Sequence, residues 1–252
     1  MIKFSMDRNL WLQSVSHLSS GEATMEATMC NSRYENRHDF RYVNKKEALP
    51  MKKELIALIK KVQDEVRKYF TFDFKFIGSS SRNMITYDAK GNTGFDFDVN
   101  IEPNTPEMYK SYEIHNIIFN ALRKSVGKYG YSKAEESTSV ITIKVIENKS
   151  IKYSCDFAIV HHFYKDQKKR QEYIKFDKYQ RRYLWNQRED EYYQLVNRIN
   201  WLKKKDLWDE LREYYIFKKN KNNAPDKHSR SIYAETIKEM CDKYGYSINS
   251  GR

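Results

Sequence analysis

The sequence predicts an α+β fold with a mixed β-sheet and flanking helices, followed by a helical C-terminal lobe. Between residues 50 and 160, apolar residues at helical spacing alternate with stretches in which every second residue is apolar. Beyond about residue 165, only helical spacing continues. The chain has 252 residues, which is enough to bury a sizeable core. We therefore expect a first domain over residues 1–165, with residues 1–49 as its N-terminal extension, and a helical lobe over residues 166–252.

The first domain contains both expected helices and expected strands. Within its N-terminal extension, only a short helix over residues 6–18 is indicated. A longer helix begins near Pro50, which suits a first helical turn, and its apolar residues recur to Tyr69. A further helix is expected over residues 107–128, with Gly130 near its end. Alternation of apolar and polar residues predicts strands over residues 72–77, 95–101, 139–147 and 151–160.

The C-terminal lobe shows helical spacing in separate segments. These segments cover residues 192–202, 207–215 and 232–244. A polar stretch over residues 220–225 separates the last two of them. Asp206 is a suitable N-cap for the middle helix, and Ser229 or Ser231 for the last one, because their side chains can accept from free N–H groups.

The composition excludes several classes of protein. Hydrophobic residues make up 40% of the chain and aromatic residues 15%, which is too many for a disordered polymer. The net charge of +12 permits an anionic ligand such as a nucleotide or nucleic acid without specifying one. The three cysteines are too few and too widely spaced for a disulfide framework or a zinc site. No apolar run reaches the roughly 20 residues of a membrane span, and the N-terminus lacks the core of a secretory signal, so we expect a cytoplasmic protein.

A Gly78-Ser79 pair ends the first expected strand, and Ser80 and Ser81 follow it. A glycine at such a turn lets backbone N–H groups approach an anion closely, and a helix start would point its positive end at a phosphate. Most Gly-Ser pairs are ordinary turns, so the pair gains meaning only together with other features.

Asp96 and Asp98 lie two residues apart on the second expected strand. Residues two apart share a face of a strand, so both carboxylates point away from the face that carries Phe95 and Phe97. Neighbouring carboxylates repel each other, and a divalent cation with a preference for oxygen ligands, such as Mg²⁺, removes that repulsion. The competing interpretation is an ordinary solvated polar face.

Asp156 is the third carboxylate of interest. It lies in the middle of the last expected strand, on the same face as Ser154, Ala158 and Val160. A buried and unpaired carboxylate costs several kcal/mol, so this one needs a cation, a hydrogen-bond donor or water. A salt bridge to a lysine or an arginine is the competing explanation.

The order of these features resembles the catalytic domain of the DNA polymerase β superfamily of nucleotidyltransferases, over roughly residues 50–160. The resemblance implies Gly78, Ser79 and Ser80 at the triphosphate of a bound nucleotide. It also implies Asp96, Asp98 and Asp156 as catalytic residues that hold Mg²⁺ or Mn²⁺. The stretch from Gly78 to Asp96 is longer than in most members, with residues 87–94 as an insertion. The helical tail is more similar to nucleotide-second-messenger synthases and oligoadenylate synthases than to the minimal members.

The resemblance implies an enzyme that moves a nucleoside monophosphate from an NTP, with ATP as the expected donor, to a hydroxyl acceptor. Pyrophosphate is the other product. The acceptor remains open between a small molecule, a nucleotide, an RNA end and a protein. One alternative is a non-catalytic module of the same fold that binds nucleotide, RNA or protein, although such a module need not keep all three carboxylates. Another is a metal-dependent nuclease, which has no triphosphate for Gly78-Ser79 to hold.

Further candidates come from the C-terminal part and from the end of the last strand. The aromatic residues that could stack on a nucleobase are Tyr179, Tyr183, Trp185, Tyr192 and Tyr193. The residues that could contact phosphates from the helical side are Lys203, Lys204, Lys205, Lys227 and Ser229. His161 and His162 are adjacent on an extended chain and point to opposite sides, so we do not expect them to bind one metal ion.

Overall fold

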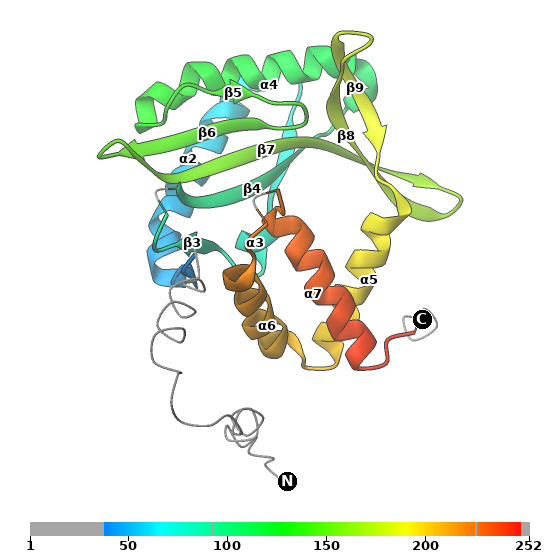
Figure 1. Cartoon of the computed structure of the whole chain (residues 1–252). Coiled ribbons are helices and arrows are strands. Elements are labelled where there is room, and N and C mark those ends of the chain that lie inside the picture. The colour runs from blue at the N-terminus through cyan, green and yellow to red at the C-terminus, as the bar shows by residue number, and fades with distance from the viewer. Residues whose placement is uncertain (1–37, 92, 225, 248–252) are drawn as a thin grey trace, which may run out of the picture. The chain divides into compact units, whose positions relative to one another are not determined.

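A mixed β-sheet lies at the centre of the computed structural model, which describes residues 38–91, 93–224 and 226–247 (Figure 1). The order across the sheet is β2-β4-β7-β6-β5, while β8 pairs with β7 and β9 pairs with β8. Strands β4 and β7 are parallel, and the other pairs of this sheet are antiparallel. The strands are β2 (Phe72–Ile77), β4 (Thr93–Pro103), β5 (Glu135–Glu136), β6 (Ile141–Glu147), β7 (Ser150–Lys165), β8 (Lys168–Asp177) and β9 (Arg182–Gln187). The α+β fold with a mixed sheet is confirmed.

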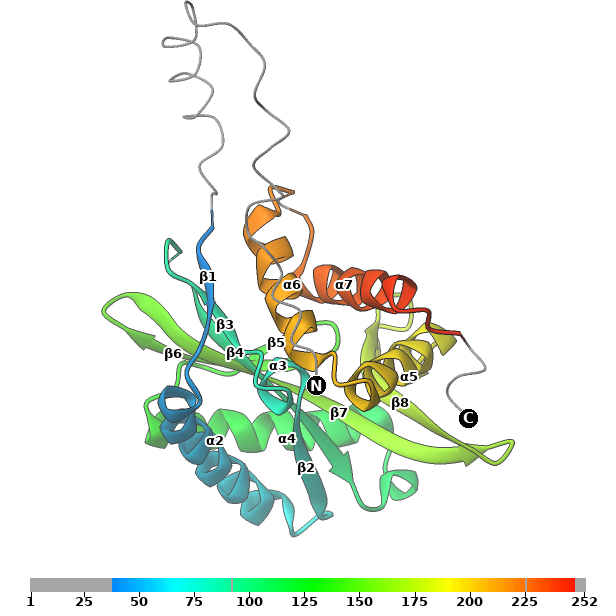
Figure 2. The ribbon, with the colours of Figure 1, turned by 90° about the horizontal axis from the view of Figure 1, so that it is seen from below.

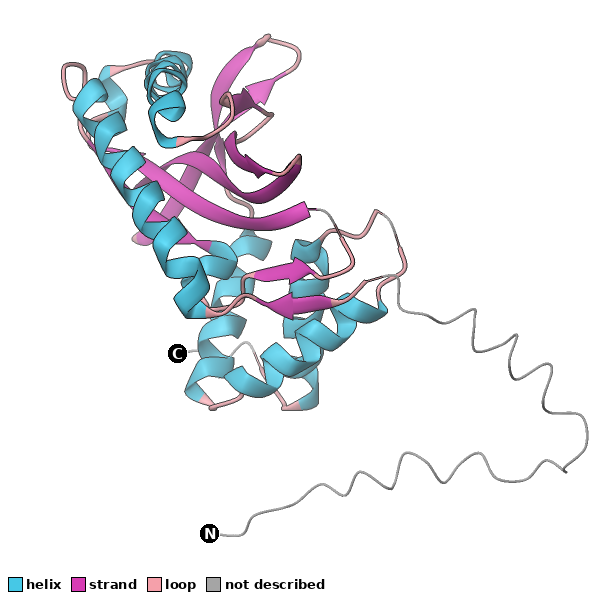
Figure 3. Ribbon diagram, turned by 90° about the vertical axis from the view of Figure 1, so that its left-hand side faces the viewer, coloured by secondary structure: helices cyan, strands magenta, loops and turns pink. Residues whose placement is uncertain are grey.

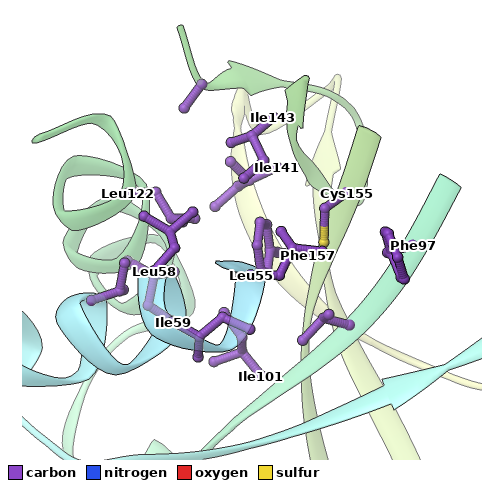
Figure 4. Packing of buried hydrophobic residues seen from close by; sticks show 14 of the residues in the cluster. Leu55, Leu58, Ile59, Phe97, Ile101, Leu122, Ile141, Ile143, Cys155 and Phe157 are labelled. Carbon is purple, nitrogen blue, oxygen red and sulfur yellow. The ribbon is translucent and has the colours of Figure 1, made fainter. Parts of the chain in front are cut away.

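The alternation in β4 divides its side chains between the two faces of the sheet. Phe97 and Val99 are completely buried, whereas Asp96 is exposed and Asp98 is half-buried on the opposite face. The buried face packs against α2 (Lys45–Val66) and α4 (Ser111–Ser125). Figure 4 shows leucine and isoleucine side chains of these two helices meeting apolar residues of β4, β6 and β7.

The two helices on this face begin at places other than those expected. α2 begins at Lys45 because the Asn44 side chain accepts from the Lys46 N–H at 2.9 Å, so Pro50 lies inside the helix. α4 begins at Ser111, where the side chain of Glu113 accepts from the Lys110 N–H at 2.8 Å. The expected helix over residues 107–128 is thus divided into a 3₁₀ turn at Pro106–Met108, α4, and a 3₁₀ turn at Val126–Tyr129.

The helical part of the C-terminal lobe begins at Asp190, later than residue 165. Residues 168–187 instead form the hairpin of β8 and β9, which extends the sheet (Figure 1). The turn between β7 and β8 consists of Asp166 and Gln167, which both have positive φ. Positive φ at two central residues is typical of a tight hairpin, but Asp-Gln lacks the glycine that usually signals it. The division of the chain into domains at residue 165 stays a prediction.

Three helices, α5 (Asp190–Lys204), α6 (Trp208–Lys221) and α7 (Ser229–Lys243), form the lobe within the described residues. Their apolar faces build a second core around Leu202, Leu211 and Ile237. The expected N-caps are wrong, because Leu207 and His228 occupy these positions. Asp206 has a φ of 57° just beyond the end of α5. None of the described helices combines the length and the apolar composition needed to cross a membrane.

Two short strands lie apart from the large sheet. β1 (Phe40–Tyr42) pairs with β3 (Thr86–Asp88) in antiparallel register, with Tyr42 opposite Thr86 (Figure 3). The expected insertion over residues 87–94 therefore belongs in part to this small sheet. The expected helix over residues 6–18 lies outside the described residues.

Candidate active site

Two parallel strands bring the three expected carboxylates together on one face of the sheet. In the pairing of β4 with β7, Asp98 lies opposite Asp156, and Asp96 lies opposite Ser154. Neighbouring strands are about 4.8 Å apart, so the carboxylates of Asp98 and Asp156 are immediate neighbours. The face that they share is opposite to the one covered by α2 and α4, and it faces the C-terminal helices (Figure 1).

Hydroxyl groups support two of the carboxylates. Ser154 donates a short hydrogen bond from its Oγ to Oδ1 of Asp96. Thr142, on β6, donates from Oγ1 to Oδ1 of Asp156 at 2.6 Å. A hydroxyl donor fixes the direction in which the other oxygen of the carboxylate points. The carboxylates of Asp96 and Asp156 are thereby each oriented by a hydroxyl group on the neighbouring strand.

Asp98 has the most unfavourable environment of the three carboxylates. Burial, together with the charges of Asp156 and Asp96, raises its pKa to about 6, although Arg82 and Arg230 oppose the shift. Burial also raises the pKa of Asp156, with the hydroxyl of Thr142 acting in the opposite direction. Two of the three carboxylates, Asp98 and Asp156, are thus partly desolvated, which favours either a proton or a cation beside them.

The turn after β2 comes into direct contact with this cluster. Gly78 has a φ of 62°, and a Cβ at this position would overlap the carboxylate of Asp98. The turn continues as α3 (Gly78–Ser81), in which the Ser80 hydroxyl donates to the Ile77 carbonyl oxygen at 2.8 Å. Ser79 is half-buried beside it. Of the expected residues, Gly78 therefore lies next to Asp98, and Ser79 and Ser80 follow it in the same turn.

The same turn is tied to the C-terminal lobe. Met84 is 2% exposed and belongs to the second core, and its N–H donates to the Ser79 carbonyl oxygen at 2.9 Å. The guanidinium of Arg82 lies 4.4 Å from the centre of the Tyr233 ring on α7. The helical lobe and the sheet therefore face each other across the turn and the carboxylates.

Solved structures resemble the chain, whereas no protein-family model and no curated protein sequence matches it. Vibrio cholerae DncV cyclic AMP-GMP synthase, in complex with nonhydrolyzable GTP, aligns with a TM-score of 0.51 and 16% identity, over 78% of this chain and 54% of that chain. Its 3'-deoxy ATP bound form aligns with a TM-score of 0.50 and 16% identity, over 89% of this chain and 58% of that chain. The STING-associated CdnE c-di-GMP synthase from Capnocytophaga granulosa aligns with a TM-score of 0.49 and 17% identity, over 78% of this chain and 61% of that chain.

Identity at this level establishes a likeness of fold. The chain has the fold of the Vibrio cholerae cyclic AMP-GMP synthase. This finding confirms the fold that the resemblance over residues 50–160 implied. The chain spans a little over half the length of the solved DncV chains, 54% and 58% in the two alignments above.

Within this fold, the structure adds a buried lysine that the sequence analysis missed. Lys219 on α6 is only 6% exposed, and its Nζ donates to Oγ1 of Thr86 at 2.5 Å. Burial lowers its pKa to about 8, while the charges of Asp96 and Asp88 oppose the shift. A signal was available, because Leu211, Tyr215 and Lys219 follow one another at intervals of four residues on one helix face.

Polar and aromatic side chains continue along the carboxylate face beyond Asp156. Nδ1 of His162 lies 2.8 Å from Glu102, and its Nε2 lies 2.9 Å from the amide of Gln171. The guanidinium of Arg188 donates from Nε to the oxygen of that amide at 3.3 Å and lies 4.0 Å from the centre of the Tyr173 ring. Burial lowers the pKa of Arg188, and the nearby charge of Arg230 lowers it further.

The expected base-stacking residues lie in different parts of the structure. The ring of Tyr192 is 5.4 Å from the guanidinium of Arg188, and the Tyr193 hydroxyl accepts from the Gln171 N–H at 2.7 Å. Tyr183 and Trp185 pack against the core on the opposite side, and Tyr179 is 98% exposed.

The residues expected to contact phosphates from the helical side also lie in different surroundings. Lys227 is paired with Glu235 at 2.7 Å. Lys203, Lys204 and Lys205 lie at the C-terminal end of α5. Ser229 interacts with the hydroxyl of Tyr215, a residue that lies one helical turn before Lys219. Ser229 is therefore the only one of these residues that the structure links to the surroundings of Lys219 among the described contacts.

The donor set of the carboxylate face fits a hard divalent cation. Three carboxylates share the face, and repulsion among them contributes to the raised pKa of Asp98. Oxygen ligands of this kind suit Mg²⁺ and Mn²⁺. In the described part of the chain, no three His, Cys, Asp or Glu side chains are already arranged around one metal position. Asp96 and Asp156 direct oxygens at Ser154 and Thr142 instead.

Proposed function

We propose that this chain transfers a nucleoside monophosphate from an NTP to a hydroxyl acceptor and releases pyrophosphate. The observation that carries this proposal is the convergence of Asp96, Asp98 and Asp156 on one face beside the Gly78 turn, in a nucleotidyltransferase fold. ATP is the donor that we expect. Phosphoryl transfer needs mainly positioning and electrostatic stabilisation, and a rigid sheet that holds three carboxylates is suited to both.

Asp96, Asp98 and Asp156 would hold Mg²⁺ or Mn²⁺, which when bound lowers the pKa of a hydroxyl nucleophile and neutralises charge on the leaving pyrophosphate. The protein's own groups perform the remaining work. Asp156, whose pKa burial raises, is the residue that we assign to orienting the acceptor hydroxyl and accepting its proton. Thr142 fixes the direction of this carboxylate.

The triphosphate would lie between the Gly78 turn and α6. On one side, the absence of a Cβ at Gly78 leaves the backbone of the turn close to the carboxylates, and Ser79 offers a hydroxyl. On the other side, Lys219 holds a positive charge within electrostatic reach of Asp96. Among the described residues, this buried ammonium contacts a hydroxyl and aromatic rings, so it is well placed to receive a phosphate oxygen.

The acceptor that we favour is a second nucleotide. Arg188 and Arg230 are close enough for their charges to interact, and two guanidinium groups near each other favour an anionic ligand. Tyr173 and Tyr192 provide aromatic rings beside Arg188. One structure of the Vibrio cholerae synthase is in complex with the linear intermediate 5' pppA(3',5')pG. An acceptor that carries phosphates agrees with both observations.

The decisive experiment incubates the purified chain with each labelled NTP, alone and in pairs, with Mg²⁺ or Mn²⁺ and with EDTA. We expect pyrophosphate together with a nucleotide product, in the presence of metal only, and neither from the Asp98→Asn variant. Binding of NTP without pyrophosphate from any pair would indicate the non-catalytic module instead. Cleavage of nucleic acid without added NTP would indicate a nuclease.

A further inference from the structure

Lys219 owes its position to residues outside its own helix. The ring of Phe40 lies under its ammonium, with Nζ 4.0 Å from the ring centre, and Thr86 accepts its hydrogen bond. Phe40 belongs to β1 and Thr86 to β3, so the small two-stranded sheet supplies both contacts. An ammonium in a buried position requires such partners, because desolvation without them is costly.

Asn220, the residue after Lys219 on α6, binds the strand β1 by hydrogen bonds. The side-chain oxygen of Asn220 accepts from the Phe40 N–H at 2.6 Å, and its amide donates to the Phe40 carbonyl oxygen at 3.1 Å. Both main-chain groups of Phe40 are therefore bound by a single side chain. This pair of bonds fixes the position of β1 along α6, and with it the position of the Phe40 ring relative to Lys219. Figure 2 shows the strand β1 beside α6.

Further contacts hold β1 at its two ends. Before the strand, the Asp39 N–H donates to the carboxylate of Asp88 at 2.9 Å, and Nδ1 of His38 lies 2.6 Å from the same carboxylate. At its other end, the Tyr42 hydroxyl donates to the Arg212 carbonyl oxygen on α6 at 2.7 Å. Since β1 takes no part in the large sheet, these contacts and its pairing with β3 determine where it lies.

We propose that Phe40 is a positioning residue for the active site, and that β1 acts as a strap that holds the Lys219 ammonium toward the carboxylates. The face of the Phe40 ring stabilises the cation on one side, so the Nζ stays directed at Thr86 and the site. Asn220 keeps the ring in place. The consequence for nucleotide binding rests on the proposed function, whereas the effect on Lys219 itself does not.

The first measurement follows Lys219 without any nucleotide. An acylating reagent for amines is applied near pH 8, and mass spectrometry gives the rate at which Lys219 is modified, relative to exposed lysines in the same sample. In Phe40→Leu, which keeps apolar bulk but removes the ring, we expect this rate to rise about three- to tenfold. Phe40→Tyr, which keeps the ring, should restore the wild-type rate.

Tyr42→Phe is the matched control, because it removes a contact between β1 and α6 that does not touch Lys219. We expect its Lys219 to react at the wild-type rate. An unchanged rate in Phe40→Leu would overturn the proposal. So would a rate that rises equally in Tyr42→Phe, since that would mean only a general loosening of the strand.

The second measurement tests the consequence for binding by a double-mutant cycle. The affinity for NTP with Mg²⁺ is measured for wild type, Phe40→Leu, Lys219→Met and the double variant. We expect Phe40→Leu to weaken binding about three- to tenfold in the wild-type background and not at all in the Lys219→Met background. Equal losses in both backgrounds would contradict action through Lys219. If wild type binds no NTP, the proposed function fails, and the modification rates alone decide the role of Phe40.

Discussion

Gly78 and Asp98 lie so close together that a Cβ on the glycine would overlap Oδ2 of the carboxylate. The cause is the register of the sheet, in which Ile77 on β2 pairs with Asp98 on β4, so the residue after Ile77 turns directly over the carboxylate. The same residue has a φ of 62°, which side chains with a Cβ rarely adopt. The turn and the carboxylate are thus parts of one arrangement.

Gly78→Ala should therefore disturb both stability and ligand binding. The positive φ alone costs on the order of 1 kcal/mol, and the overlap with Asp98 forces the turn or the carboxylate to move. We expect a loss of about 2 kcal/mol or more in the free energy of unfolding, measured by urea titration, and loss of NTP binding. Gly127→Ala is the control, because a Cβ there meets nothing within 4 Å. Equal effects of the two substitutions would contradict the contact.

The environment of Asp98 predicts a pH dependence of stability. Its pKa is raised from 3.8 to about 6 by burial and by the other two carboxylates. Between these two values the unfolded chain ionises Asp98 while the folded chain keeps it protonated, so this residue makes the fold less stable as the pH rises. The expected loss from pH 4 to pH 7 is about 2 kcal/mol, since one pKa unit corresponds to about 1.4 kcal/mol.

Asp98→Asn removes this contribution, so in EDTA the variant should gain stability relative to wild type between pH 4 and pH 7. Urea titrations of both proteins at pH 4 and at pH 7 measure this difference in the free energy of unfolding. Asp209→Asn, which changes an exposed carboxylate, is the control and should show no such difference from wild type. If the variant instead loses stability relative to wild type as the pH rises from 4 to 7, then Arg82 or Arg230 pairs with Asp98, and this attraction outweighs the repulsion.

Part of this arrangement was predictable from local patterns. The alternation around Phe97 placed Asp96 and Asp98 on one face, and Gly78-Ser79 marked the turn. That Asp156 lies opposite Asp98 was accessible only through the resemblance to a family, because strand pairing depends on contacts between residues far apart in sequence. The close approach of Gly78 to Asp98 likewise follows from the register of β2 with β4, which no local pattern reveals.

Other parts were missed for identifiable reasons. β8 and β9 were not recognised because Asp166 and Gln167 form the preceding turn without glycine or asparagine. Sequence reasoning does not single out Lys219, because a lysine in a basic chain is expected on a solvated surface, although it continues the apolar stripe of Leu211 and Tyr215. An interruption of an apolar stripe by a single charged residue was the signal to follow.

Mg²⁺ should stabilise the wild-type chain against unfolding at pH 7, because a cation among the three carboxylates relieves their repulsion and binds only the folded state. A rise in melting temperature with Mg²⁺ concentration, absent in the presence of EDTA, is the expected result. Asp98→Asn should shrink the rise, while Asp209→Asn, at an exposed position on α6, should leave it unchanged. An equal rise in all three proteins would place the cation elsewhere.

Lys219→Met should separate stability from ligand binding. The ammonium is buried and its pKa is lowered to about 8, so at pH 7 the fold carries a charge that its surroundings disfavour. Methionine is unbranched, apolar and of similar length, and it can continue the stripe of Leu211 and Tyr215. We therefore expect the free energy of unfolding without ligand to be unchanged or up to about 2 kcal/mol higher, because replacement of a buried charge by apolar bulk is often stabilising.

The affinity of Lys219→Met for NTP with Mg²⁺ should fall about tenfold or more, a loss of about 1.4 kcal/mol, while its affinity for the nucleoside without phosphates should not change. Isothermal titration with both ligands, beside urea titration of the free protein, measures these quantities, and Lys221→Met at the exposed end of the same helix is the control. A less stable variant that binds NTP as tightly as wild type would show that Lys219 serves the packing of α6 against β1 and β3, and not the triphosphate.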